Sequence, residues 1–244
     1  MSEDQYPSLL GILGGLGPMS GIYFCEMLTR HTLAKKDSEH LNFILSSRAD
    51  TPDRSSFILG LSDDDPTPRM RSEAKRLEAA GAELLVIPCN TAHYFYAKVT
   101  EAVDIPILNI IEETARLCDL EKIKKVCVLA TEGTVRSGAY KDIFDRYGIE
   151  IAALSKEEQD FITETIFERI KSGLEPDIAK FTRLCKDLLD TRCERVILGC
   201  TELSLIKKEY ALGPGFLDAM EVLARQSVLS CGKRVKPQYD NLIS

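Results

Sequence analysis

The segment VIPCNT at residues 86–91 has the same pattern as the segment VILGCTE at residues 196–202. Each contains an apolar run, then a Pro or Gly, a cysteine, and an amide or hydroxyl side chain. A short apolar run bounded in this way is consistent with a buried strand. We therefore expect Cys89 and Cys200 to follow two equivalent strands, so that both thiols lie at the end of a strand, where it opens into a loop or helix.

Short β-rich runs alternate with longer segments of helical period along the rest of the chain, as in βαβ units around parallel sheets. The expected strands span residues 9–13, 41–46, 84–88, 107–109, 126–130, 149–153 and 195–199. The expected helices span residues 20–34, 68–80, 92–102, 111–120, 137–147, 157–172, 177–190 and 217–230.

A second repeat supports an internal duplication. The segment GPMSGIYF at residues 17–24 resembles GTVRSGAY at residues 133–140, and nearly the same length of chain separates these segments as separates the two cysteines. The sequence therefore predicts an α/β protein with two similar domains, each a mostly parallel sheet flanked by helices. Ligands of open parallel sheets bind beyond the carboxyl ends of the strands, so we expect the site in the cleft between the domains.

Composition and charge argue against several classes of protein. A net charge of −7, without an extended basic cluster, makes nucleic acid an unsuitable partner. No apolar run approaches the roughly 20 residues that cross a bilayer, and the N-terminus lacks a signal-peptide pattern, so we expect a cytoplasmic protein without a membrane partner. Because 44% of the residues are apolar, the eight cysteines are expected to be reduced thiols rather than a disulfide framework.

Paired thiols are suited to proton transfer at carbon. Inverting a stereocentre without redox chemistry requires one group that removes a proton from one face and another that returns a proton to the opposite face. Cys89 and Cys200 both precede expected helix starts, where the helix dipole lowers a thiol pKa. Asn90, Thr91 and Thr201 are then placed to hold a substrate carboxylate. Two buried structural thiols are the alternative interpretation.

Three motifs occur in order along the chain: LGGLGP at residues 13–18, PCNTAH at 88–93 and GCTE at 199–202. Together they resemble the aspartate/glutamate racemase family, specifically its cofactor-independent aspartate racemase branch. The resemblance covers most of the chain through further fragments, which are PDR at 52–54, NIIEET at 109–114, LATEGT at 129–134 and EVLAR at 221–225.

The resemblance implies a racemase of aspartate that uses no pyridoxal phosphate or other cofactor and no metal, and it leaves glutamate open as a further substrate. It makes Cys89 and Cys200 the two bases and implies a homodimer. It also places residues 1–112 and 210–244 in the domain that carries Cys89, and residues 113–209 in the domain that carries Cys200. The residues that it assigns to the carboxylate- and ammonium-binding shell are Asn90, Thr91, Thr131 and Thr201.

A dicarboxylic amino acid also needs a partner for its side-chain carboxylate, and a guanidinium is well suited to this. Arg54 matches a family position that contacts substrate, although nearby Arg48 could compete. Lys171 is a second candidate. The alternative is that Arg54 closes a surface turn and Lys171 is a solvated residue at a helix C-terminus. Glu202, which stands where glutamate racemases have a histidine, is included among the candidate substrate-binding residues.

His93, four residues after Cys89, permits a Cys-His nucleophile or a zinc site as further hypotheses. Neither is preferred, because no Cys-x-x-Cys or His-x₃₋₅-His spacing supports a metal. Ser20 stands where a dinucleotide fingerprint needs its third glycine, so nicotinamide binding is disfavoured.

Two other functions remain open. A different reaction on the same scaffold, such as hydantoin racemisation, maleate isomerisation or malonate decarboxylation, would retain one or both thiols. A non-catalytic amino-acid-binding protein would bind aspartate without exchanging its α-proton. Aspartate racemases usually have Gly-Met-Gly-Pro-x-Ala-Thr at the first turn, whereas residues 15–21 are GLGPMSG. The resemblance therefore does not define the contacts between substrate and this part of the pocket.

Overall fold

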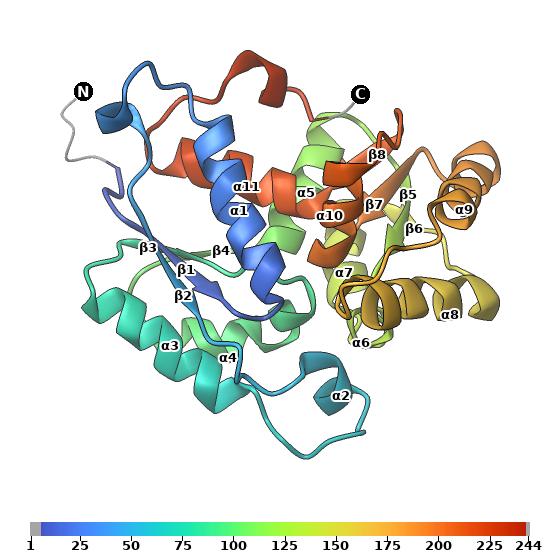
Figure 1. The fold of residues 1–244 in the computed structure, drawn as a ribbon, viewed down its shortest axis with the longest axis horizontal. Helices are drawn as coiled ribbons and strands as arrows, with labels where there is room; N and C mark the ends of the chain where they lie inside the picture. Colours follow the sequence, from blue (N-terminus) through green and yellow to red (C-terminus); the bar gives the residue numbers. More distant parts are fainter. Residues whose placement is uncertain (1–5, 243–244) are drawn as a thin grey trace.

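Two parallel four-stranded sheets organise the protein, whose computed structural model describes residues 6–242 (Figure 1). In the first sheet, the strand order is β2-β1-β3-β4, with β1 at Leu10–Gly14, β2 at Phe43–Ser47, β3 at Leu84–Val86 and β4 at Ile107–Leu108. In the second sheet, the order is β6-β5-β7-β8, with β5 at Lys125–Leu129, β6 at Glu150–Ile151, β7 at Arg195–Leu198 and β8 at Phe216–Asp218.

The two sheets repeat one topology, which confirms the predicted α/β class with two similar halves. In each sheet the first strand of that half lies between the second and the third. The register pairs Ile12 with Leu45 and Val86 in the first sheet, and Val128 with Ile197 in the second. These central strands are almost entirely buried, as expected for parallel sheets covered on both faces.

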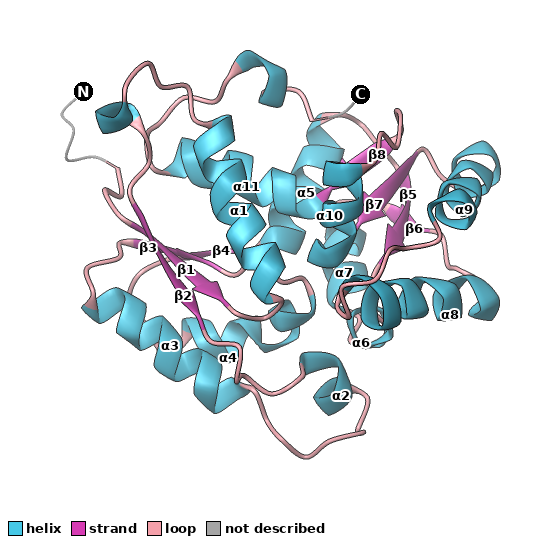
Figure 2. Cartoon of the chain, viewed as in Figure 1, coloured by secondary structure: helices cyan, strands magenta, loops and turns pink. Residues whose placement is uncertain are grey.

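Helices cover both faces of each sheet (Figure 2). They are α1 (Pro18–His31), α2 (Arg54–Ile58), α3 (Thr67–Ala79), α4 (Tyr96–Thr100), α5 (Ile110–Leu120), α6 (Glu132–Arg136), α7 (Ala139–Arg146), α8 (Lys156–Glu164), α9 (Ile178–Thr191), α10 (Thr201–Glu209) and α11 (Ala219–Ser230). The short 3₁₀ segments are Asp37–Glu39, Thr91–Phe95 and Pro237–Tyr239, and Thr165–Ile170 forms a π-helix directly after α8.

A shared middle layer joins the two halves. Helix α11 follows β8 of the second sheet but packs against α1 and α5, so these helices lie between the sheets (Figure 1). Successive strand residues point to opposite faces. Accordingly, Ile12 and Val128 belong to one continuous core in this middle layer, whereas Leu13 and Leu129 belong to separate outer cores.

Equivalent caps begin the two helices that cross into this layer. The Asn109 side chain follows β4 and accepts hydrogen bonds from the backbone of Ile111 at 2.9 Å and Glu112 at 3.2 Å. The Asp218 side chain ends β8 and accepts one from the backbone of Met220 at 2.9 Å. Each cap satisfies amide groups that the first turn of a helix leaves free.

The structure corrects several of the expected elements. Helices α2, α6 and α10 were not among the expected helices. Strand β8 was not predicted, because its three residues run directly into α11, and the combined apolar run indicated a helix from residue 217. The expected helix at 157–172 is α8 followed by the π-helix, and the expected helix at 92–102 is a 3₁₀ turn followed by α4. Because β8 pairs with β7, residues 216–218 lie in the second sheet, while α11 packs on α1 of the first half. The division of the chain at residue 210 stays a prediction.

No helix in residues 6–242 is long and apolar enough to cross a membrane.

Helices α2 and α6, which belong to different halves of the protein, are in close contact. A Cβ added at Gly133 in α6 would lie 2.8 Å from Cα and Oγ of Ser55 in α2. We expect Gly133→Ala to lower the free energy of unfolding by about 1–3 kcal/mol through overpacking, as measured by urea denaturation. The matched control is Gly21→Ala in α1, where the nearest atom would be 3.8 Å away. An unchanged stability in Gly133→Ala would show that Ser55 can shift away from the added methyl group without a net cost.

Candidate active site

Both motif cysteines lie just beyond the carboxyl end of a strand and line the same cavity. Cys89 follows β3 and precedes the 3₁₀ turn, and Cys200 follows β7 and is the N-cap residue of α10. The other residues that line the cavity are Leu16, Asp53, Arg54, Ser55, Asn90, Thr91, Thr131, Lys171, Thr201 and Glu202. The structure thus brings together all nine residues that the sequence analysis selected, together with Leu16, Asp53 and Ser55, which it did not select.

The cavity is closed, and a larger pocket adjoins it. The space that a water-sized sphere can occupy in the cavity is about 10 Å³, which is room for about one water molecule. The outer pocket has a volume of about 470 Å³. The residues that line both spaces are Asp53, Arg54, Lys171 and Glu202. These four side chains therefore form the boundary between the closed cavity and the outer pocket.

Four buried hydroxyl groups form a cluster on one side of the cavity. The Thr91 hydroxyl lies 3.1 Å from that of Thr131 and 2.8 Å from that of Thr134. Thr131 and Thr134 are 2.9 Å apart, and Ser55 donates to Thr131 at 3.2 Å. The cluster thereby joins α2, the 3₁₀ turn and the N-terminus of α6. Sequence reasoning missed Ser55 and Thr134, although Thr134 ends the LATEGT fragment.

Asn90 presents free donors beside the first thiol. Its Oδ1 accepts a hydrogen bond of 2.7 Å from the hydroxyl of Tyr140. This contact orients the amide, and its Nδ2 is buried without a hydrogen-bond partner among the described residues. A buried donor without a partner costs free energy, so this group is suited to a ligand oxygen.

The two thiols have raised pKa values, contrary to the expectation from helix starts. Burial raises the pKa of Cys89; the positive charges of Arg54 and Lys171 oppose the shift, and Glu202 adds to it. Burial and then Glu202 raise the pKa of Cys200 well above its usual value. Removal from water outweighs the helix dipole here because the thiolate loses its hydration.

Glu202 contacts the second thiol directly. Cys200 Sγ donates a hydrogen bond of 2.9 Å to Oε2 of Glu202, and the Thr201 hydroxyl donates to the same oxygen at 3.3 Å. The Glu202 side chain is buried and makes no ion pair within residues 6–242. A carboxylate is therefore hydrogen-bonded to one thiol of the pair.

Arg54 is held by backbone carbonyl groups. One terminal nitrogen donates to the carbonyls of Thr51 and Pro52 at 3.1 and 2.9 Å, and the other donates to that of Leu16 at 2.9 Å. The buried Nε has no partner within the described chain. Arg54 therefore shapes the wall of the cavity, and its Nε–H is left for a ligand.

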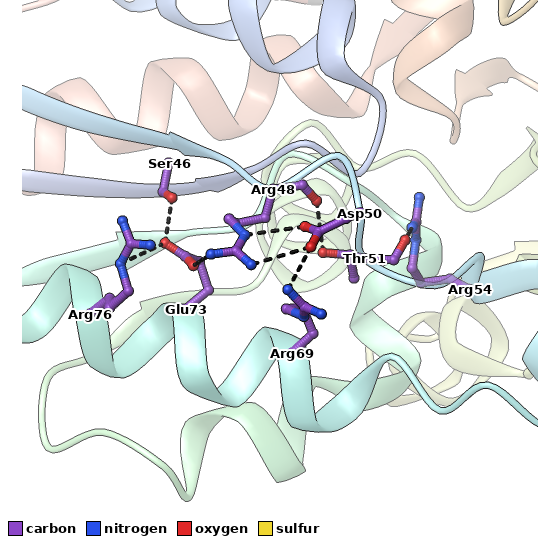
Figure 3. Close-up of polar contacts among 8 residues, drawn as sticks. All are labelled: Ser46, Arg48, Asp50, Thr51, Arg54, Arg69, Glu73 and Arg76. Atoms are coloured by element: carbon purple, nitrogen blue, oxygen red, sulfur yellow. Dashed lines mark hydrogen bonds and ion pairs between the residues drawn. The ribbon is translucent and has the colours of Figure 1, made fainter.

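Arg48, the competing candidate, belongs to a separate ion-pair network (Figure 3). Its Nε lies 3.2 Å from Oδ1 of Asp50, and its guanidinium also pairs with Glu73 at 3.7 Å. Arg48 does not line the cavity.

Lys171 supplies a second cation at the boundary of the cavity. It follows the π-helix, and its Nζ lies 4.4 Å from the centre of the Phe167 ring. The side chain has no carboxylate partner within 4.0 Å among residues 6–242. Its ammonium group is consequently free to bind an anionic ligand.

His93 contacts the backbone of Cys89 and not its thiol. Nδ1 lies 2.9 Å from the backbone oxygen of Cys89, and the backbone N–H of Ile110 donates to Nε2 at 3.2 Å. These contacts assign the proton to Nδ1. Burial lowers the pKa of His93 to about 4, so the ring is neutral near pH 7. His93 thus ties the cysteine loop to the start of α5.

No three His, Cys, Asp or Glu side chains in residues 6–242 are grouped as a metal site.

Together, the fold and the site define a two-domain α/β protein with paired cysteines in a closed polar cavity. Residues 13–227 match the family model of the Asp/Glu/hydantoin racemases, and the chain belongs to this family of isomerases.

Two similar proteins match at least nine-tenths of the chain, and a third matches part of it. A broad specificity amino-acid racemase, RacX of Bacillus subtilis, is 25% identical over 233 residues, which are 90% of this chain and 96% of the relative. The solved structure of Picrophilus torridus aspartate racemase has a TM-score of 0.81 and 28% identity, and the match covers 95% of this chain and 97% of that one. A glutamate racemase of Aquifex aeolicus is 29% identical over 62% of this chain and 57% of its own length.

The neutral buried state of His93 predicts a specific pH dependence of stability. Its folded pKa of about 4 lies below the unfolded value of about 6.5, so the unfolded chain binds the proton more tightly. The stabilisation is complete above about pH 6.5 and is lost as the pH falls toward 4. We expect the stability difference between the wild type and His93→Gln to shrink by about 2 kcal/mol from about pH 7 to pH 5, in urea unfolding. A difference that is constant with pH would contradict the buried neutral ring.

Proposed function

We propose that this protein is a cofactor-independent amino-acid racemase that interconverts L- and D-aspartate, with glutamate as a second substrate. In this proposal Cys89 and Cys200 transfer protons at opposite faces of the α-carbon. The observation that carries it is that both thiols line one small cavity. The solved aspartate racemase with the same fold supports the choice of substrate class.

The cavity walls offer suitable partners for the α-carboxylate. The unpaired Nδ2 of Asn90 and the hydroxyl groups of Thr91 and Thr131 are donors on the side of Cys89. Hydrogen bonds to the carboxylate stabilise the negative charge that develops when the α-proton leaves. The substrate ammonium group adds a positive charge beside the thiols, which favours a thiolate despite burial.

Two cationic side chains are available to bind the second carboxylate of the substrate. Lys171 has a free ammonium group at the boundary of the cavity, and Arg54 retains one free donor at Nε. Lys171 also lies close enough to lower the pKa values of Cys89 and Cys200. A dicarboxylic amino acid would therefore bind with its side chain toward this boundary.

Substrate entry requires the site to open. Space for about one water molecule is too small for an amino acid, and the walls come from both halves of the chain. The outer pocket leads to the same boundary residues, so we propose that substrate enters from it.

A broader range of amino acids is the second candidate function. The outer pocket is lined in part by the apolar side chains of Met19, Ile170 and Leu205. These would accommodate a side chain larger than that of aspartate, and the Bacillus subtilis relative is a broad specificity racemase.

Deuterium exchange at the α-carbon tests the proposed function. We expect purified protein in deuterium oxide to exchange the α-hydrogen of L- and D-aspartate, which NMR and chiral chromatography will detect. Cys89→Ser and Cys200→Ser should each abolish racemisation, because each removes one of the two proton-transfer groups. A panel of larger amino acids measures the breadth of specificity.

Absence of exchange with both aspartate and glutamate would refute the named substrates. Racemisation that persists in either serine variant would remove that cysteine from the mechanism. Cys25→Ser is the matched control, since Cys25 lies in α1 and does not line the cavity.

A second prediction concerns the side-chain carboxylate. Lys171→Met should raise the KM for aspartate about 10-fold, because a hydrogen bond to a charged group contributes about 1.5–3 kcal/mol. The matched control is Lys180→Met, whose ammonium group also lies over a ring, 4.2 Å from the centre of Phe161, but which does not line the cavity. Steady-state kinetics give the KM of each variant. Equal effects of the two substitutions would exclude a specific contact of Lys171 with substrate.

A further inference from the structure

The hydroxyl group of Tyr140 makes a polar contact between the two halves of the protein, beside the cavity. Tyr140 is the second residue of α7, in the second half, and it donates a hydrogen bond of 2.7 Å to Oδ1 of Asn90, which follows Cys89 in the first half. Both residues are almost fully buried, with 4% of Tyr140 and 2% of Asn90 exposed. Tyr140 does not itself line the cavity, so any influence that it has on a bound substrate passes through the residues that it contacts.

The proton of this hydroxyl group determines which way the Asn90 amide faces. A tyrosine hydroxyl has one proton to donate, and its acceptor among residues 6–242 is Oδ1 of Asn90. Burial raises the pKa of Tyr140 well above its usual value, so the hydroxyl stays protonated near neutral pH. If the amide were reversed, the Tyr140 proton would lose its buried acceptor at a cost in free energy. Oδ1 therefore faces Tyr140, and Nδ2 is left without a partner in the described part of the chain.

The position of the Tyr140 side chain is fixed by core packing and by the loop of the second cysteine. Its ring centre lies 5.4 Å from that of Phe144, one turn further along α7, and both rings belong to the core of the middle layer. Gly199 precedes Cys200, and a Cβ at Gly199 would lie only 3.3 Å from the Tyr140 hydroxyl oxygen. The absence of a side chain at this position lets the hydroxyl group lie close to the Cys200 loop while it bonds to the opposite half.

We propose that Tyr140 is a positioning residue for the α-carboxylate of the substrate, an inference that rests on the proposed racemase function. The hydroxyl group orients the Asn90 amide so that Nδ2 donates to the carboxylate. Without the hydroxyl group, the amide can turn and present Oδ1, whose partial negative charge repels a carboxylate. The atom that touches the substrate is Nδ2 of Asn90, so the role of Tyr140 is exerted through that residue.

Double-mutant kinetics test whether Tyr140 acts through Asn90. Tyr140→Phe removes the hydroxyl group and keeps the ring, and we expect it to lower kcat/KM for racemisation of aspartate about 10-fold, because an oriented hydrogen bond to a charged group is lost. Asn90→Ala removes the donor and should lower kcat/KM at least as much. In the Asn90→Ala background, Tyr140→Phe should change kcat/KM by less than about twofold, because the effects of residues that share one contact are not additive.

Tyr147→Phe is the matched control. Tyr147 directly follows α7, its hydroxyl group donates to Oε1 of Glu112 at 2.5 Å, and it does not line the cavity. Loss of this hydroxyl group should leave kcat/KM unchanged, and urea unfolding checks that every variant is folded.

Two kinetic outcomes would overturn the proposal. Equal losses from Tyr140→Phe with and without the Asn90 amide would make the hydroxyl group a purely structural contact. Wild-type kinetics in Tyr140→Phe would show that Asn90 needs no orienting partner.

NMR of the side-chain amides provides a readout that does not require turnover. The chain has four asparagines, so isotope-labelled asparagine gives few side-chain signals, and Asn90→Ala identifies those of Asn90. We expect Tyr140→Phe to shift the Nδ2 signals of Asn90, whereas Tyr147→Phe leaves them in place. Unshifted Asn90 signals in Tyr140→Phe would refute the orienting contact. If the wild type exchanges no amino acid while these signals shift, the proposed function fails, and with it the substrate role of Asn90, whereas the orienting contact stands.

Discussion

Mutual hydrogen bonding among buried hydroxyl groups is the constraint on which the site depends. The hydroxyl groups come from three segments that are far apart in the chain, and they belong to Ser55, Thr91, Thr131 and Thr134. A hydroxyl group that is buried without a hydrogen-bond partner lowers the stability of the fold by about 1–3 kcal/mol. Their contacts hold α2, the 3₁₀ turn and α6 together. The cavity is therefore closed by polar groups that satisfy one another and that can instead bind a polar ligand.

Duplication of the fold does not make the two thiols chemically equivalent. Both cysteines follow corresponding strands, β3 and β7, of sheets with the same order. The residues that follow them differ, since Asn90 and Thr91 succeed Cys89 whereas Thr201 and Glu202 succeed Cys200. The repeated architecture places the two cysteines at equivalent positions, and the residues that follow them give the two thiols different charged surroundings.

Local sequence patterns predicted every strand except β8, and they predicted that the two cysteines lie in one site. The reason is that the periodicity of apolar residues and the starts of helices are encoded within a few residues. Strand β8 escaped prediction because FLD is too short to separate from the apolar pattern of α11. The pKa direction of Cys89 and Cys200 was wrong because a helix start is visible in the sequence, whereas depth of burial depends on both halves. Ser55 was missed for a related reason, since its partner Thr131 is 76 residues away.

The shared middle layer has a consequence for how the chain can be divided. Helices α5 and α11 leave different sheets but pack on each other, and one continuous core contains residues of both sheets. A cut near residue 122, between the two sheets, would leave the N-terminal fragment without α11 over α1. Each fragment would then present an apolar face to water, so the complementary fragments would reassociate rather than persist as independent folding units.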